Sequence, residues 1–153
     1  REYILKTIGE SNIKQTLKEV LSPYVQSFIE LPLYDSVGCG DAMIADETIQ
    51  DMYPVPSDLI RKGAKYFALR TSGDSMNQLG INDGDIILCQ KNYQAPSGSI
   101  AIVLIGEEAV LKEIQYEKDG LLLRPRSTNP RHKPRKLGEY DDFKVLGTFI
   151  KKL

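Results

Sequence analysis

Most of this chain alternates hydrophobic and polar residues or carries short hydrophobic runs, with little of the wider spacing of a helix. Runs of about four to eight residues of this kind are typical of β-strands. The segments that predict strands are 28–34, 66–69, 86–89, 99–105, 109–114, 120–124 and 144–150. Glycine-containing turns at 106–108 and 118–120 join neighbouring segments into hairpins. We therefore predict a mainly β fold with a curved, partly closed sheet.

A helical pattern is confined to the beginning of the chain. Residues 10–22 fit one helix, with Ser11 as a candidate N-cap and Pro23 as its stop. The hydrophobic residues that fall on one face of this helix are Ile13, Leu17, Val20 and Leu21. We expect a short connecting or docking helix without chemistry of its own. The arm would span residues 1–30 and the main domain residues 31–153.

Prolines and glycines mark the segments between this helix and the main series of strands. Pro32 predicts that 28–34 is an edge strand, because proline cannot donate a ladder hydrogen bond. The composition of residues 35–41 predicts a flexible, exposed loop. Residues 43–60 contain two prolines and predict a strand, a loop and a short helical turn near 57–61.

Length and charge narrow the classes of function. At 153 residues, the chain has the size of one ordinary domain with an appended arm. It carries 20 Lys and Arg against 21 Asp and Glu, a net charge of -1, which argues against a nucleic-acid-binding domain over its whole length. The first residue is Arg1 rather than Met, which predicts a fragment or a processed product.

The cysteines and the hydrophobic runs indicate where the protein resides. Two cysteines without a secretory leader fit a reducing compartment, so we expect a cytoplasmic protein. Cys89 closes a hydrophobic run and is expected to be buried, whereas Cys39 lies between two glycines in the expected exposed loop. No Cys-x-x-Cys pair suggests a metal site, and we expect no metal and no cofactor. The longest strongly apolar run, 100–105, is too short to span a membrane.

Residues 71–85 hold the candidate chemistry. They lie between two predicted strands and carry three glycines and several small polar residues, among them Ser75. A serine nucleophile needs a neighbouring base. The single histidine, His132, lies in a basic loop without a carboxylate nearby in sequence, so a Ser-His-Asp triad lacks support. Lys112 is the other candidate base, since burial among apolar neighbours would lower its pKa, although periodicity alone favours a solvent-facing lysine.

Four stretches together resemble a known family. They are L-P-L-Y-D-S-V-G-C-G at 31–40, S-G-D-S-M at 72–76, G-I-N-D-G-D-I at 80–86 and V-L-K-E-I at 110–114. Lys112 follows Ser75 by 37 positions. This order and spacing resembles the self-cleaving repressor family, which includes LexA, the lambdoid phage repressors and the polymerase accessory protein UmuD.

The resemblance implies a domain of the LexA C-terminal type with a Ser-Lys dyad made of Ser75 and Lys112. Ser75 would attack the carbonyl carbon of Cys39, and neutral Lys112 would take its proton and later donate it to the leaving amine. Backbone N–H groups of Asp74 and Ser75 would stabilise the oxyanion.

The same resemblance places the cleavage site in the loop 35–42, at the bond between Cys39 and Gly40. Gly40 lacks a Cβ, which allows the backbone to turn sharply towards a nucleophile. Cys39 is small enough for a tight pocket. A nucleophilic role for Cys39 is the alternative for that residue, although no base lies near it in sequence.

The implied function is the self-cleaving and dimerising C-terminal half of a LexA-like or phage-type transcriptional repressor, which relieves repression after DNA damage in the SOS response. Implied partners are a second copy in a homodimer, a RecA filament as trigger, and operator DNA bound through a domain outside this sequence. The helix at 10–22 would be the remnant of the linker to that domain. A UmuD-like accessory protein of an error-prone polymerase is the alternative. A type I signal peptidase, which also uses Ser and Lys, fits less well because of the internal Cys-Gly site and the lack of an anchor.

Two further segments leave alternatives open. The hydrophobic residues of the final strand, 144–150, fit the core, whereas the resemblance implies that the last strands form a two-fold dimer interface. The loop between the last predicted strands carries six basic residues and is either a nucleic-acid patch or a solvated connection. These residues are Arg124, Arg126, Arg131, Lys133, Arg135 and Lys136. The absence of interleaved aromatic residues favours the solvated connection.

Overall fold

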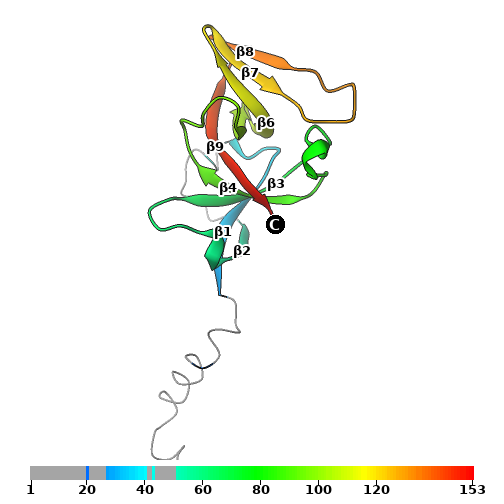
Figure 1. The fold of residues 1–153 in the computed structure, drawn as a ribbon. Helices are drawn as coiled ribbons and strands as arrows, with labels where there is room; N and C mark the ends of the chain where they lie inside the picture. Colours follow the sequence, from blue (N-terminus) through cyan, green and yellow to red (C-terminus); the bar gives the residue numbers. More distant parts are fainter. Residues whose placement is uncertain (1–19, 21–26, 41–42, 44–50) are drawn as a thin grey trace, which may run out of the picture.

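The computed structural model describes residues 20, 27–40, 43 and 51–153, and within them nine strands form one mixed sheet. The order across the sheet is β2-β1-β3-β4-β9-β5-β6-β7-β8 (Figure 1). The strands are β1 (Phe28–Asp35), β2 (Asp51–Pro56), β3 (Tyr66–Arg70), β4 (Ile86–Lys91), β5 (Ile100–Ile105), β6 (Glu108–Glu117), β7 (Gly120–Arg124), β8 (Arg135–Gly138) and β9 (Phe143–Lys152). Two 3₁₀ turns are η1 (Ser57–Leu59) and η2 (Asn77–Leu79). The mainly β prediction is confirmed, and the sheet is not closed into a barrel.

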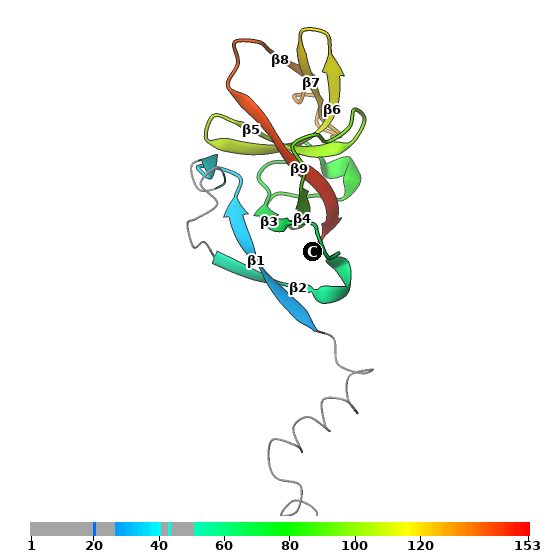
Figure 2. The same cartoon turned by 90° about the vertical axis from the view of Figure 1, so that its left-hand side faces the viewer.

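The long strand β9 joins the two halves of the sheet. It pairs antiparallel with β4 on one side and with β5 on the other. Figures 1 and 2 show β9 running through the middle of the molecule, with β1 and β2 at one end and β6, β7 and β8 at the other. Its close approach to β4 depends on Gly147, where an added Cβ would lie 2.3 Å from the carbonyl oxygen of Gln90.

The predicted hydrophobic runs supply the buried core. The first cluster gathers Phe67, Leu69, Ile87, Ile102 and Leu146 with other buried residues, including Cys39, Met43 and Met76. The second cluster fills the end formed by β5 to β9 and contains Ala101, Val103, Ile114, Leu121, Leu123, Leu137 and Val145. The third, beside β2, contains Leu31, Val55, Tyr66 and Leu88. The site described below lies against the first cluster, through Met76 and Leu111.

The seven strands predicted from hydrophobic or alternating runs are all present, with ends that differ by a few residues. The segment 120–124 coincides with β7, and 109–114 forms the middle of β6. In β9, Val145 and Leu146 are buried as the core alternative expects, whereas Ile150 is 41% exposed. Strand β8 was not predicted, because it has four residues and only Leu137 among them is buried.

The edge-strand prediction for Pro32 is wrong. Strand β1 lies between β2 and β3, antiparallel to the first and parallel to the second. The pairing with β3 starts only at Leu33, and Pro32 is paired with Met52 of β2. No ladder bond to β3 is therefore lost at the proline, which makes it tolerable within an inner strand.

Other predictions near the beginning of the chain are tested only in part. The helix predicted at 10–22 lies outside the described residues except for Val20, which is exposed. The predicted strand and helical turn within 43–60 correspond to β2 and η1. No helix in the described part of the chain is long and apolar enough to cross a membrane.

Candidate active site

The connection between β3 and β4 is a hydrogen-bonded turn that presents Ser75. The Thr71 N–H donates to the carbonyl oxygen of Asp85 at 2.8 Å, and the Gly84 N–H donates back to the Thr71 carbonyl oxygen at 2.9 Å. Its glycines Gly73, Gly80 and Gly84 have φ angles of +84°, +76° and +84°, values that other residues rarely adopt. The turn chemistry predicted for residues 71–85 is thus confirmed, and backbone bonds at its base fix the position of the loop.

Lys112 and Ser75 are in direct contact. The Nζ atom of Lys112, in the middle of β6, lies 2.5 Å from the Oγ atom of Ser75. The lysine side chain is half-buried, and burial lowers its pKa below the ordinary value because the charged form loses hydration. A solvent-facing lysine, which periodicity alone favours, is not what the structure contains. The contact brings together a hydroxyl and an amine that are 37 residues apart in sequence.

A cavity of about 100 Å³ opens beside this contact. Its walls come from the residues after β1, the end of β3, the Ser75 turn and the first half of β6. Hydrophobic lining residues are Val37, Leu69, Met76, Ile81, Ala109, Val110 and Leu111. Polar groups, among them Ser36, Thr71 and Ser72, complete the lining. A small space of this mixed character next to a serine hydroxyl can accept a short side chain of a peptide. Among the described residues, no group of three or more His, Cys, Asp or Glu side chains could hold a metal ion.

The predicted cleavage segment packs against the hairpin formed by β5 and β6. The Ala109 N–H donates to the Ser36 carbonyl oxygen at 2.7 Å, and the Cys39 N–H donates to the Glu107 carbonyl oxygen at 3.0 Å. Val37 forms an antiparallel bridge with Glu108 between them. The prediction of an exposed loop at Cys39 is wrong, because its side chain is only 5% exposed and belongs to the first core cluster. Glycine-rich composition signalled a loop, yet small residues also allow close packing.

The scissile bond proposed from the resemblance is held locally in this structure. The Cys39 carbonyl oxygen accepts the Met43 N–H at 2.9 Å. An added Cβ on Gly40 would lie 2.9 Å from the Gly106 carbonyl oxygen and 2.8 Å from Oε2 of Glu107. Burial raises the pKa of the Cys39 thiol, which disfavours the thiolate needed for a nucleophilic cysteine. In the described residues, Ser36 and Val37 are the part of this segment that lines the cavity.

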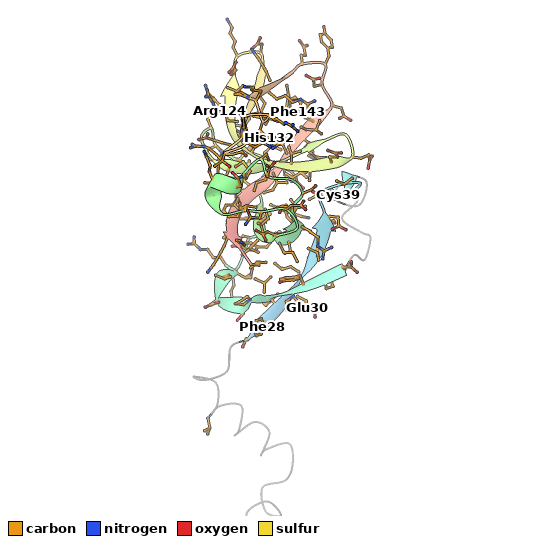
Figure 3. The ribbon with its side chains drawn as sticks, turned by 90° about the vertical axis from the view of Figure 1, so that its right-hand side faces the viewer. Phe28, Glu30, Cys39, Arg124, His132 and Phe143 are labelled. Carbon is orange, nitrogen blue, oxygen red and sulfur yellow. The ribbon has the colours of Figure 1, made fainter. Side chains whose placement is uncertain are left out.

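His132 contacts a carboxylate that the sequence analysis did not associate with it. Its Nε2 atom lies 2.5 Å from Oδ1 of Asp74, although the two residues are 58 positions apart. The histidine thus faces the residue before Ser75, whereas the Ser75 hydroxyl contacts Lys112. His132 and Arg124 line one shallow pocket, and Figure 3 shows Cys39 beyond the end of β1. The arrangement gives the imidazole a carboxylate partner without making it the partner of the serine.

The loop between β7 and β8 packs on the Ser75 turn with one side. The Arg126 N–H donates to the Ser75 carbonyl oxygen at 2.8 Å, and the Gln78 N–H donates to the Arg126 carbonyl oxygen at 2.9 Å. In Figure 1 this loop reaches towards η2. The six basic residues of this region are exposed, as the solvated-loop interpretation expects. That interpretation is nevertheless incomplete, because the small polar residues between the basic ones are hydrogen-bonded to the serine turn.

Comparisons with known proteins identify relatives of this chain. Curated relatives include the LexA repressor of Clostridium kluyveri, 34% identical over 136 residues, which are 89% of this chain and 65% of the repressor. The LexA repressor of Leptospira interrogans is 40% identical over 104 residues, 68% of this chain and 50% of that repressor. The LexA repressor of Clostridium botulinum is 34% identical over 144 residues, 94% of this chain and 69% of the repressor. The chain therefore spans between half and about two thirds of the length of these relatives.

The family model agrees in extent with the sheet. The model described as Peptidase S24-like matches residues 32–150, which run from β1 to β9 and include both Ser75 and Lys112. This chain belongs to the peptidase S24-like family.

Proposed function

We propose that this domain is a serine peptidase that cuts its own chain between Cys39 and Gly40, with Ser75 as nucleophile and Lys112 as general base. The observation that carries the proposal is the distance of 2.5 Å between Nζ of Lys112 and Oγ of Ser75 beside a small, partly open cavity. A neutral lysine can take a serine proton, and burial lowers the pKa of Lys112 in the direction that this role requires.

The reaction proceeds in two halves. Neutral Lys112 accepts the proton from Oγ of Ser75 while that oxygen bonds to the carbonyl carbon of Cys39. The C–N bond to Gly40 then breaks, and Lys112 gives the proton to the leaving amine. In the second half, water attacks the Cys39 acyl ester, Lys112 accepts its proton, and Oγ of Ser75 leaves and regains a proton. The products are a carboxylate at Cys39 and a free amine at Gly40.

Negative charge develops on the carbonyl oxygen of Cys39 during both halves. In this proposal the backbone N–H groups of Asp74 and Ser75 stabilise it, because fixed donors aimed at the oxyanion lower the barrier. The turn that carries both groups is held by Thr71, whose hydroxyl donates to the carbonyl oxygens of Asn82 and Asp85 at 3.1 and 2.8 Å. Such a preformed turn needs little reorganisation when the charge appears.

The packed cleavage segment provides the control over this reaction. The Cys39 carbonyl oxygen is bonded to Met43, and the Cys39 side chain is buried in the core. The segment must leave this position before Ser75 can attack. A partner that binds only the conformer with Cys39 at Ser75 would raise the cleavage rate by a shift of population. A RecA filament is the partner that we propose.

The parent protein in this proposal is a LexA-like transcriptional repressor. The curated relatives carry the name LexA repressor, and each extends beyond the part that this chain matches. Operator DNA would bind that further part, and a homodimer of this domain would pair two such parts. Cleavage would separate them from the domain and relieve repression after DNA damage. The relatives favour this assignment over a UmuD-like accessory protein.

Intact-mass spectrometry tests the proposal directly. The purified chain is incubated at neutral and alkaline pH over a range of protein concentrations. We expect a fragment that begins at Gly40, formed at a rate independent of dilution, as an intramolecular reaction requires. Purified RecA with single-stranded DNA and ATP should accelerate its formation at neutral pH. An uncut chain under all of these conditions would contradict the proposal.

A further inference from the structure

The loop between β7 and β8 forms several hydrogen bonds with the dipeptide Asp74-Ser75. Both of its carbonyl oxygens accept hydrogen bonds from this loop, at Asp74 from the Ser127 hydroxyl at 2.7 Å and at Ser75 from the Arg126 N–H at 2.8 Å. The Asp74 carboxylate is held as well, by Asn129 and His132. We call the residues Arg126, Ser127, Asn129 and His132 the brace.

Ser127 acts on the peptide group that contains a proposed oxyanion donor. The Asp74 carbonyl and the Ser75 N–H belong to one planar peptide group, and in a trans peptide they point in opposite directions. A hydrogen bond that fixes the carbonyl oxygen therefore also fixes the direction of the N–H. The Asn77 N–H donates to the same carbonyl oxygen at 3.3 Å, a weaker contact than the 2.7 Å bond from Ser127. Ser127 is thus the main determinant of where the Ser75 N–H points.

Arg126 links the serine turn to the strand that carries the lysine. Its backbone N–H donates to Ser75, and its guanidinium group binds both carboxylate oxygens of Glu113 at 3.0 and 2.8 Å. Glu113 directly follows Lys112 in β6. One residue therefore spans the two segments whose side chains meet, which stabilises the distance between Oγ and Nζ.

Asn129 and His132 hold the side chain of the same dipeptide. The Asn129 amide donates to Oδ2 of Asp74 at 3.1 Å, and Nε2 of His132 lies 2.5 Å from Oδ1. These contacts, that of His132 first, keep the pKa of the Asp74 carboxyl below its ordinary value, so the carboxylate is ionised at neutral pH. A clamped Asp74 cannot rotate its backbone freely, which adds to the effect of Ser127 on the peptide group.

We propose that the brace is a set of positioning residues that aim the Ser75 N–H at the oxyanion and keep Ser75 beside Lys112. This inference rests on the proposed self-cleavage, and it assigns to the basic loop a role in that reaction. The brace touches neither the scissile bond nor the Ser75 hydroxyl in this structure. Its effect on rate is transmitted through the backbone of residues 74 and 75.

Substitutions at Ser127 test the proposal. Ser127→Ala removes the hydroxyl that fixes the peptide group, and we expect the self-cleavage rate constant to fall about 100-fold, the loss typical of a misplaced oxyanion donor. Ser127→Thr keeps a hydroxyl and should restore most of the rate. Lys133→Ala is the matched control in the same loop, because Lys133 is exposed. A rate for Ser127→Ala within about threefold of the wild-type rate would overturn the proposal.

Amide hydrogen exchange tests the positioning role of the brace independently of the cleavage reaction. We expect Ser127→Ala to accelerate amide exchange in residues 73–76 while the β3 and β4 amides keep their protection, and Lys133→Ala to change neither. Asn129→Ala should also accelerate amide exchange in residues 73–76. This variant replaces Ser127→Ala in the test if the Ser127 variant fails to fold. A wild-type chain that never cuts would contradict self-cleavage but would leave this readout intact. Unchanged amide exchange in residues 73–76 of both Ser127→Ala and Asn129→Ala would refute the role of the brace, whatever the cleavage result.

Discussion

The carbonyl oxygen of Cys39 lies 2.9 Å from the amide nitrogen of Met43 and accepts its hydrogen bond. The carbonyl that we propose as the target of Ser75 is therefore occupied by a local backbone contact. The Cys39 side chain adds to the restraint, since it is packed in the first core cluster. In the proposed self-cleavage, this segment must therefore undock before the reaction can begin.

Thiol labelling can follow this undocking. Both cysteines are buried, but Cys39 lies in the docked segment and Cys89 in the inner strand β4. We expect Cys39 to react with a thiol reagent before Cys89, because opening of one segment costs less than unfolding of the sheet. Labelling followed by peptide mapping measures both rates. Equal rates would mean that the segment opens only together with the fold.

Substitution of the proposed nucleophile should abolish cleavage without loss of structure. Ser75→Ala removes the hydroxyl, which contacts Lys112, but leaves the backbone bonds and the Thr71 hydroxyl bonds that hold the turn. We expect no Gly40 fragment by mass spectrometry and a melting temperature within a few degrees of the wild type. Persistent cutting at the same bond would rule out Ser75 as the nucleophile.

The cleavage rate should rise with pH. Burial lowers the pKa of Lys112, yet below that pKa most lysine side chains remain charged and cannot accept a proton. Each unit of pH then increases the neutral fraction about tenfold, and the rate follows until the pKa is reached. Measured rates from neutral to alkaline pH check this slope. Lys112→Arg, which stays charged, should be inactive throughout, and a flat or falling wild-type profile would argue against the lysine base.

A carboxylate at position 40 should block cleavage. In the docked position, a Cβ on Gly40 would already crowd the Gly106 carbonyl oxygen and the Glu107 carboxylate. In the proposed cleavage position, we expect the larger side chain to crowd the scissile bond beside Ser75. We expect no fragment from Gly40→Asp or Gly40→Glu, together with faster labelling of Cys39. Normal cutting in these variants would place the cleavage site elsewhere.

Stability should be sensitive to Gly147 and tolerant at Gly138. An alanine Cβ at Gly147 would lie 2.3 Å from the Gln90 carbonyl oxygen, so β9 and β4 must move apart. Overpacking of this kind costs about 1–3 kcal/mol of unfolding free energy. At Gly138 the nearest atom to an added Cβ would be Oδ2 of Asp141, at 3.8 Å. We therefore expect the unfolding free energy to change by only a few tenths of a kcal/mol, within about 0.5 kcal/mol. Urea denaturation of the two alanine variants provides the comparison, and similar midpoints would contradict it.

The strands and the serine turn could be predicted because their signals are local. Hydrophobic runs mark β3, β4 and β5, and the glycines of the turn adopt the positive φ angles that such residues favour. The meeting of Ser75 and Lys112 was predicted from resemblance, since periodicity alone suggested an exposed lysine. The structure contains that contact.

The features that escaped prediction depend on packing between distant segments. Asp74 and His132 are 58 positions apart, and no local pattern links them. The burial of Cys39 arises from the hairpin of β5 and β6, which lies about 70 residues further along the chain. Patterns among neighbouring residues in the sequence cannot predict either contact. The small polar residues Ser127 and Asn129, surrounded by charge, were the available hint that one side of their loop is bound.

The docked segment contacts the same strand, β6, that carries the proposed base Lys112. Glu108, which bridges to Val37, begins β6, and Lys112 follows four residues later in the same strand. At about 3.3 Å per residue, these two points are about 13 Å apart. The proposed cleavage segment would therefore have to move only a short distance to reach Ser75 and Lys112. A few residues of extended chain span a distance of this size. In the proposed self-cleavage, the domain would keep its own substrate segment docked on the hairpin of β5 and β6, one short displacement away from the residues that cut it.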